Sequence, residues 1–208
     1  MSNALWYVGR GTGVASLLLL TIVVALGIAT RSGRPLLGLP RFAVAAVHRT
    51  ASLTAVVFLL IHVGTLYFDP YAQLHVVDFL VPFTGAYRPF WLGLGTVGFD
   101  LIAALVVTSL LRHRIGLRTW RAIHWLAYLS WPVALSHALG NGTDNSTWWL
   151  RAVAAACTLT VLGAIGWRVS ERFQEYGDTR VPPRPGNRSS GMAAEQRVEI
   201  SSTGQGVR

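Results

Sequence analysis

The sequence predicts an all-α integral membrane protein with about five transmembrane helices. Its 208 residues are 52% apolar and only 13% charged, which lies far outside the usual balance of a soluble domain. The apolar residues also gather into runs of about 17 to 25 residues, the length that crosses about 30 Å of hydrocarbon at about 1.5 Å per residue. The formal charge of +9 does not indicate nucleic-acid binding, because the arginines flank the apolar runs and do not alternate with aromatic side chains.

Each expected helix is bounded by residues that break helices or carry charge. The first run ends at the Ser, Gly and Pro of residues 31–35, and the second ends at Asp69 and Pro70. The first run lacks a basic start and a small-x-small cleavage site, so we expect a retained helix and not a signal peptide. The five expected helices cover about residues 13–30, 42–68, 90–111, 122–139 and 147–169.

The arginine distribution predicts the orientation in the plasma membrane, because short cytoplasmic loops retain positive charge. One basic loop joins the first two helices and another joins the third and fourth, whereas the alternate loops carry few arginines. Residues 1–12 should therefore be external, residues 13–169 should form the membrane domain, and residues 170–208 should be a disordered cytoplasmic tail rich in Pro, Gly and Ser. The external loop 69–89 should include a short interfacial segment at residues 79–83. The arginines of the two basic loops are Arg31, Arg34, Arg41, Arg49, Arg112, Arg114, Arg118 and Arg121.

Four histidines fall inside the expected membrane segments, where ionisable residues are costly and usually functional. His48 and His62 are 14 residues apart on the second helix, and His124 and His137 are 13 apart on the fourth. These two helices run in the same direction, so His48 should lie level with His124, and His62 with His137. The two levels are about 20 Å apart, which suits two haems stacked along the membrane normal.

These histidines have two alternative roles that their spacing leaves open. They could be hydrogen-bonded core residues that bind nothing, but four histidines at matched depths on two helices that run in the same direction argue against this role. A zinc or copper site is a second rival, but four side chains at levels about 20 Å apart cannot meet at one small ion. A spacing of 14 residues returns close to the same face of a helix, whereas a spacing of 13 does not, so His48 and His62 share a face better than His124 and His137 do. Pro132 lies between His124 and His137 and could re-aim one of them by kinking the fourth helix.

With this spacing, the sequence resembles the ferric reductase-like transmembrane domain, which NADPH oxidases and yeast ferric reductases share. The resemblance covers about residues 10 to 170. The sequence looks like the short actinobacterial members, and the resemblance rests on the paired histidines and on six short motifs. The motifs are His48–Arg49, Asp69–Ala72, Leu80–Phe83, Tyr87–Pro89, Trp120–Tyr128 and Gly140–Asp144.

The resemblance implies that His48, His62, His124 and His137 ligate two b-type haems that relay electrons from a cytosolic flavin to an outer acceptor. The chain departs from the larger relatives in lacking FAD and NADPH domains, so we expect it to be the membrane component of an oxidoreductase with a separate donor, such as a cytosolic flavoprotein. The alternative is a non-catalytic haem-binding or anchor subunit, similar to the membrane subunit of the bacterial methionine-sulfoxide reductase system.

Several other residues are candidates for supporting roles. Arg49 and Arg121, adjacent to the ligand histidines, are expected to hold haem propionates at the inner level. Positive-inside topology alone would also explain these arginines. Trp131 could fill the space between the haems or belong to the core, and Asp100 should be protonated or hydrogen-bonded inside the membrane. Further candidates of the same kinds are Arg41 and Arg118 for the inner haem, Arg88 or Arg151 for the outer haem, and Phe58 between the two.

Overall fold

The computed structural model describes residues 2–32, 38–70, 72, 74–141 and 147–170, and these form an all-helical bundle. The cytoplasmic tail expected at residues 170–208 lies outside the described residues except for Ser170. The helices are α1 (Ser2–Ala29), α2 (Arg41–Tyr67), α3 (Val76–Leu80), α4 (Pro89–Leu110), α5 (Arg112–Ile115), α6 (Leu117–His124), α7 (Leu126–Asn141) and α8 (Trp148–Val169).

Four of these helices, α1, α2, α4 and α8, are long and apolar enough to cross a membrane. Their ends follow the sequence signals, since α2 begins directly after Pro40 and α4 has Pro89 at its first position, where the missing N–H costs no helical hydrogen bond. Gly116, with φ of 82°, separates α5 from α6 in a conformation that favours glycine. Helix α1 begins at Ser2, so residues 2–12, expected to precede the membrane domain, continue its first helix.

The fifth expected helix, residues 122–139, is divided in the structure. Helix α6 ends at His124 and α7 begins at Leu126, and the N–H groups of Trp125 and Tyr128 bond three residues back, to Ala122 and Trp125. The break therefore follows His124 directly, whereas α7 continues through Pro132. Helix α7 has 16 residues, so it does not reach spanning length alone.

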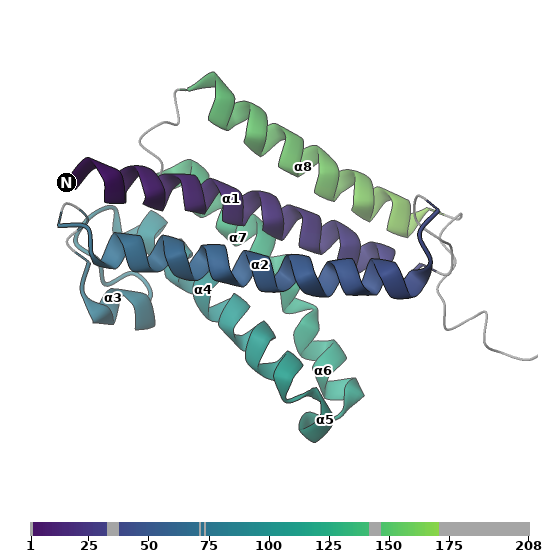
Figure 1. The fold of residues 1–208 in the computed structure, drawn as a ribbon. Helices are drawn as coiled ribbons and strands as arrows, with labels where there is room; N and C mark the ends of the chain where they lie inside the picture. Colours follow the sequence, from purple (N-terminus) through teal and green to yellow (C-terminus); the bar gives the residue numbers. More distant parts are fainter. Residues whose placement is uncertain (1, 33–37, 71, 73, 142–146, 171–208) are drawn as a thin grey trace, which may run out of the picture.

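The helices form two packed pairs held together by α1. Helices α1 and α2 are antiparallel along their length, α4 packs against α7, and α1 also contacts α7 and α8 (Figure 1). The small core lies where α1, α7 and α8 meet, and there Trp131 donates a buried hydrogen bond from Nε1 to Oγ1 of Thr21 at 2.9 Å. Other core residues are Leu17, Val24, Ile28, Cys157 and Val161.

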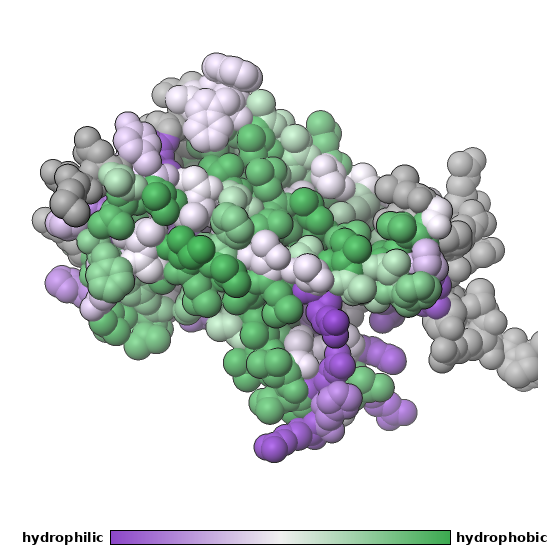
Figure 2. Space-filling view, in the orientation of Figure 1, coloured by the Kyte–Doolittle hydropathy of each residue, from purple (hydrophilic) through white to green (hydrophobic). Residues whose placement is uncertain are grey.

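The two ends of the bundle differ in chemistry. We call them the α3 end, where α1 starts and α2 finishes, and the α5 end, where α4 finishes and α6 starts. Figure 2 shows a mostly apolar face over α1 and α2 and a hydrophilic projection where α5 and α6 lie. The exposed basic side chains of that projection are Arg112, His113, Arg114, Arg118 and Arg121.

At the α3 end, the loop between α2 and α4 is fastened by Asp78. Its carboxylate accepts hydrogen bonds from the backbone N–H of His75 and the hydroxyl of Thr84, both at 2.9 Å, and Thr96 of α4 donates to its carbonyl at 2.7 Å. The backbone N–H of His75 and the hydroxyl of Thr84 stabilise the ionised form and lower the pKa of Asp78. Helix α3 begins after His75, so the short segment expected at residues 79–83 starts inside a helix.

Candidate functional site

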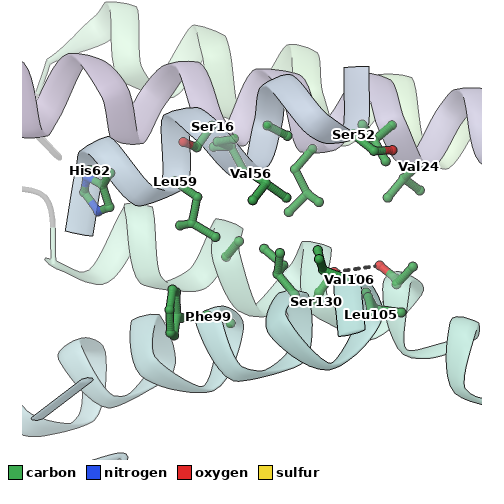
Figure 3. A pocket seen from close by; sticks show the side chains of 18 of the residues that line it. Ser16, Val24, Ser52, Val56, Leu59, His62, Phe99, Leu105, Val106 and Ser130 are labelled. Atoms are coloured by element: carbon green, nitrogen blue, oxygen red, sulfur yellow. Dashed lines mark hydrogen bonds between the residues drawn. The ribbon is translucent and has the colours of Figure 1, made fainter. Parts of the chain in front are cut away.

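A cavity of about 1520 Å³ lies between the α1–α2 pair and the α4–α7 pair. In Figure 3, side chains of α1 and α2 face those of α4 and α7 across it. Its volume exceeds the roughly 300 to 1,000 Å³ typical of a pocket for one small ligand. The middle of the cavity is apolar, with Val56 and Leu59 on one side and Phe99, Ile102 and Val106 on the other.

All four histidines predicted from the sequence line this cavity. At the α3 end, the ring centres of His62 and His137 are 6.5 Å apart and their planes are inclined at 78°. His48 and His124 line the same cavity toward the α5 end. The structure thus brings together the predicted pair His62 and His137, and it places His48 and His124 on the lining of the same cavity.

Backbone carbonyl groups orient three of the four imidazoles. Nδ1 of His62 lies 2.7 Å from the carbonyl oxygen of Gly9, and Nδ1 of His48 lies 3.1 Å from that of Val23. Nδ1 of His137 lies 2.8 Å from the carbonyl oxygen of Trp91. Because a carbonyl oxygen only accepts, each Nδ1 carries the proton, and the neutral ring keeps its lone pair on Nε2.

His124 is held in another way. Its Nδ1 is buried without a hydrogen-bond partner among the described residues, and its ring stacks on Trp120 with centres 4.8 Å apart and planes 30° apart. Trp120 is itself placed by a hydrogen bond from its Nε1 to Oγ of Ser109 on α4, at 3.3 Å. Ring stacking therefore orients this imidazole in place of a carbonyl.

The arginines divide between those that line the cavity and those that do not. Arg49 and Arg121, the two favoured by their position next to ligand histidines, both line it. Arg41, Arg118 and Arg151 are not among its described lining residues, and Arg88 donates from Nη1 to the carbonyl of Gly140 at 2.9 Å. Four further arginines that were not among the candidates for holding haem propionates also line it, namely Arg10, Arg31, Arg112 and Arg168.

The aromatic and acidic candidates turn out differently from the histidines. Trp131 is 7% exposed and belongs to the core, which was one of the two roles expected for it. Neither Trp131 nor Phe58 is among the residues lining the cavity. Phe99 lines the middle of the cavity and was not singled out by the sequence. Asp100 is exposed on α4, and its carboxylate contacts no hydrogen-bond partner in the described part of the chain.

Most of the membrane domain matches a known family of membrane proteins. A family model described as "Ferric reductase like transmembrane component" matches residues 12–135. The chain belongs to this family. The resemblance expected from the sequence is thereby confirmed, and the family together with four apolar helices makes the chain a multi-pass membrane protein. No curated protein and no solved structure matches it.

The residues of this ferric reductase-like chain fit the haem groups that the family generally binds. Two metal–imidazole bonds of about 2 Å, each extended by roughly 1.1 Å to the ring centre, span about 6.2 Å, close to the 6.5 Å between His62 and His137. The described residues contain no group of three or more His, Cys, Asp or Glu able to hold a bare metal ion. Two imidazoles at each level suit an iron whose other ligands come from a porphyrin. His137 lies two residues beyond the family match, so its role rests on this geometry.

Proposed function

We propose that this ferric reductase-like chain transfers electrons across the plasma membrane through two b-type haems. His48 and His124 would hold the inner haem, and His62 and His137 the outer haem. The observation that carries the proposal is one continuous cavity lined at two levels by paired imidazoles, with 6.5 Å between the ring centres of the outer pair. The haems, when bound, supply one-electron redox chemistry.

The protein's own groups would set ligation, charge balance and exclusion of water. The Nδ1–H bonds to carbonyl groups leave Nε2 of His48, His62 and His137 available as ligands. Arg49 and Arg121 provide guanidinium groups suited to the propionate carboxylates. The apolar side chains between the two levels would limit the entry of water into the space that separates the haems.

The charge asymmetry of the two ends supports one orientation of the chain in the membrane. The basic projection of α5 and α6 favours the cytoplasm for the α5 end, so the start of α1 would be external and the segment after α8 cytoplasmic. Helices α6 and α7 together would make the fifth crossing. An electron moving outward is then favoured by about 2.3 kcal/mol per 100 mV of inside-negative potential for a full crossing.

A cytosolic donor, such as a flavoprotein, would reduce the inner level, and an extracytoplasmic acceptor would oxidise the outer level. Ferric iron, oxygen, a quinone or a partner protein could serve as that acceptor. A non-catalytic haem-binding or anchor subunit is the competing function. It would contain the same haems but would show no transfer from an inner donor to an outer acceptor.

The deciding experiment is the haem content of the full chain purified after expression with ample haem supply. We expect about two haems per polypeptide from the reduced-minus-oxidised spectrum, and about one in His48→Ala or His124→Ala. His75→Ser is the matched control, because this loop histidine does not line the cavity and serine is a good helix N-cap. A colourless chain, or two haems retained in both ligand variants, would refute the proposal.

Transfer is then tested in vesicles with the donor inside and ferricyanide outside. Oxidation of the donor across the membrane supports the relay, and loss of this activity in His137→Ala assigns the outer step. Haem-loaded vesicles that transfer no electrons would instead favour the anchor function.

A further inference from the structure

The three carbonyl-bonded histidines share a feature on the helix that each one contacts. The carbonyls belong to Gly9, Val23 and Trp91, and in every case the residue four positions later is glycine. These glycines are Gly13, Gly27 and Gly95, and each lies against the ring of the histidine that bonds the corresponding carbonyl. We call Gly9–Gly13, Val23–Gly27 and Trp91–Gly95 the carbonyl–glycine pairs.

Helix geometry explains why the spacing is four. The carbonyl of residue i accepts the N–H of residue i+4 and keeps a second lone pair on its outer side. The Cα–Cβ bond of residue i+4 is tilted toward the helix N-terminus, so its Cβ covers that outer side. Glycine at i+4 leaves room for a flat imidazole to reach the carbonyl.

The distances show how closely each ring fills this room. A Cβ added to Gly95 would lie 2.6 Å from Cε1 and 2.7 Å from Nδ1 of His137. A Cβ on Gly13 would lie 2.9 Å and 3.0 Å from the same atoms of His62. On Gly27 it would lie 3.4 Å from Cε1 of His48, which is an ordinary contact.

We infer that Gly13, Gly27 and Gly95 are positioning residues that, through the carbonyl–glycine pairs, fix the ring orientation and Nδ1–H tautomer of His62, His48 and His137. This inference rests on the proposed haem function for its purpose, because an imidazole locked in this form keeps Nε2 facing the cavity. The outer level then has two locked rings. The inner level has one, since His124 has no carbonyl partner among the described residues and is stacked on Trp120.

The distances predict a graded response to adding one methyl group. Gly95→Ala should displace His137 and reduce haem content from about two to about one per polypeptide. Gly13→Ala should do so less completely, and Gly27→Ala should retain both haems, whereas Gly27→Leu should lose one. Gly11→Ala is the matched control, because Gly11 lies on α1 two residues from Gly13 and a Cβ there meets nothing within 4 Å.

Haem loss alone could reflect misfolding, so a spectroscopic readout accompanies it. The full chain labelled with ¹⁵N-histidine, prepared with and without haem, reports the protonated nitrogen of each ring, with signals assigned by single histidine substitutions. We expect His48, His62 and His137 to carry the proton on Nδ1 in both preparations. In Gly95→Ala only His137 should lose this preference.

Two results would overturn the inference. One is a mixed or Nε2–H tautomer at the three histidines of the unsubstituted chain, and the other is equal haem content in Gly95→Ala and Gly11→Ala. Failure of the proposed function looks different, because a chain that takes up no haem would still report its tautomers by NMR. Fixed Nδ1–H forms in such a chain would support the positioning role while refuting the haem function.

Discussion

A membrane potential imposed on vesicles containing the full chain should redistribute an electron between the two histidine levels. His48 and His62 are 14 residues apart on α2, which places the levels about 21 Å apart along the helix. This is about 0.7 of a hydrocarbon core of about 30 Å. At about 2.3 kcal/mol per charge per 100 mV for a full crossing, the electron gains about 1.6 kcal/mol per 100 mV. The outer-to-inner ratio should therefore rise about 15-fold.

The assay uses oriented vesicles with a potassium gradient and valinomycin, poised so that each chain carries one electron on average. Reference spectra of the separate levels come from His48→Ala, which should keep the outer haem, and His137→Ala, which should keep the inner haem. The α-band should shift toward the outer spectrum under inside-negative potential and back under the opposite sign. A ratio that does not respond while both haems are present would show that the levels lie at equal depth, which would refute the depth difference worked out from helix α2.

Three further outcomes follow from single contacts. Trp120→Leu removes the ring stacked on His124, so we expect selective loss or altered potential of the inner haem in a redox titration, whereas Trp120→Phe should retain it. Thr21→Val leaves the buried Nε1–H of Trp131 without its acceptor and should lower the free energy of unfolding in detergent by about 1 kcal/mol, while Thr21→Ser should not. Asp78 has a pKa lowered below 3.8, so its stabilising contribution is complete above that pH and is lost as the pH falls through the native pKa. The midpoint of thermal unfolding should therefore differ between wild type and Asp78→Ala at neutral pH, and the difference should shrink as the pH falls through the native pKa of Asp78. A constant difference would contradict a stabilising role for the ionised carboxylate.

The main features of the fold could be predicted because they follow from composition and spacing. Apolar runs of spanning length give α1, α2, α4 and α8, and their ends lie at proline, glycine or charged residues. The histidine pairs could be predicted because residue number along a helix converts directly to depth. These predictions depend only on properties of one segment at a time.

The break at Trp125 could not be predicted in the same way. Pro132 is the strongest local signal in residues 122–139, yet α7 continues through it, because a helix interrupted by proline can stay regular when its neighbours pack well. The break instead follows His124, where two N–H groups bond three residues back and no glycine or proline is present. Local residue types therefore do not mark this position.

The partners of the histidine rings were also beyond sequence reasoning, because they depend on how each helix is rotated about its axis. The chain has 21 glycines, and the sequence alone does not distinguish Gly13 and Gly95 from Gly11. Only the packed structure shows that the first two contact imidazole rings and the third has open space beside it. The same rotation explains why Arg49 and Arg121 reach the cavity and Arg118 does not.

The separation of the α1–α2 pair from the α4–α7 pair has a consequence for biogenesis. Each pair is a helical hairpin that can insert from the translocon as a unit, since its internal contacts do not require the other pair. Under the proposed function, haem would then join surfaces that belong to both hairpins and add to the contacts that α1 makes with α7.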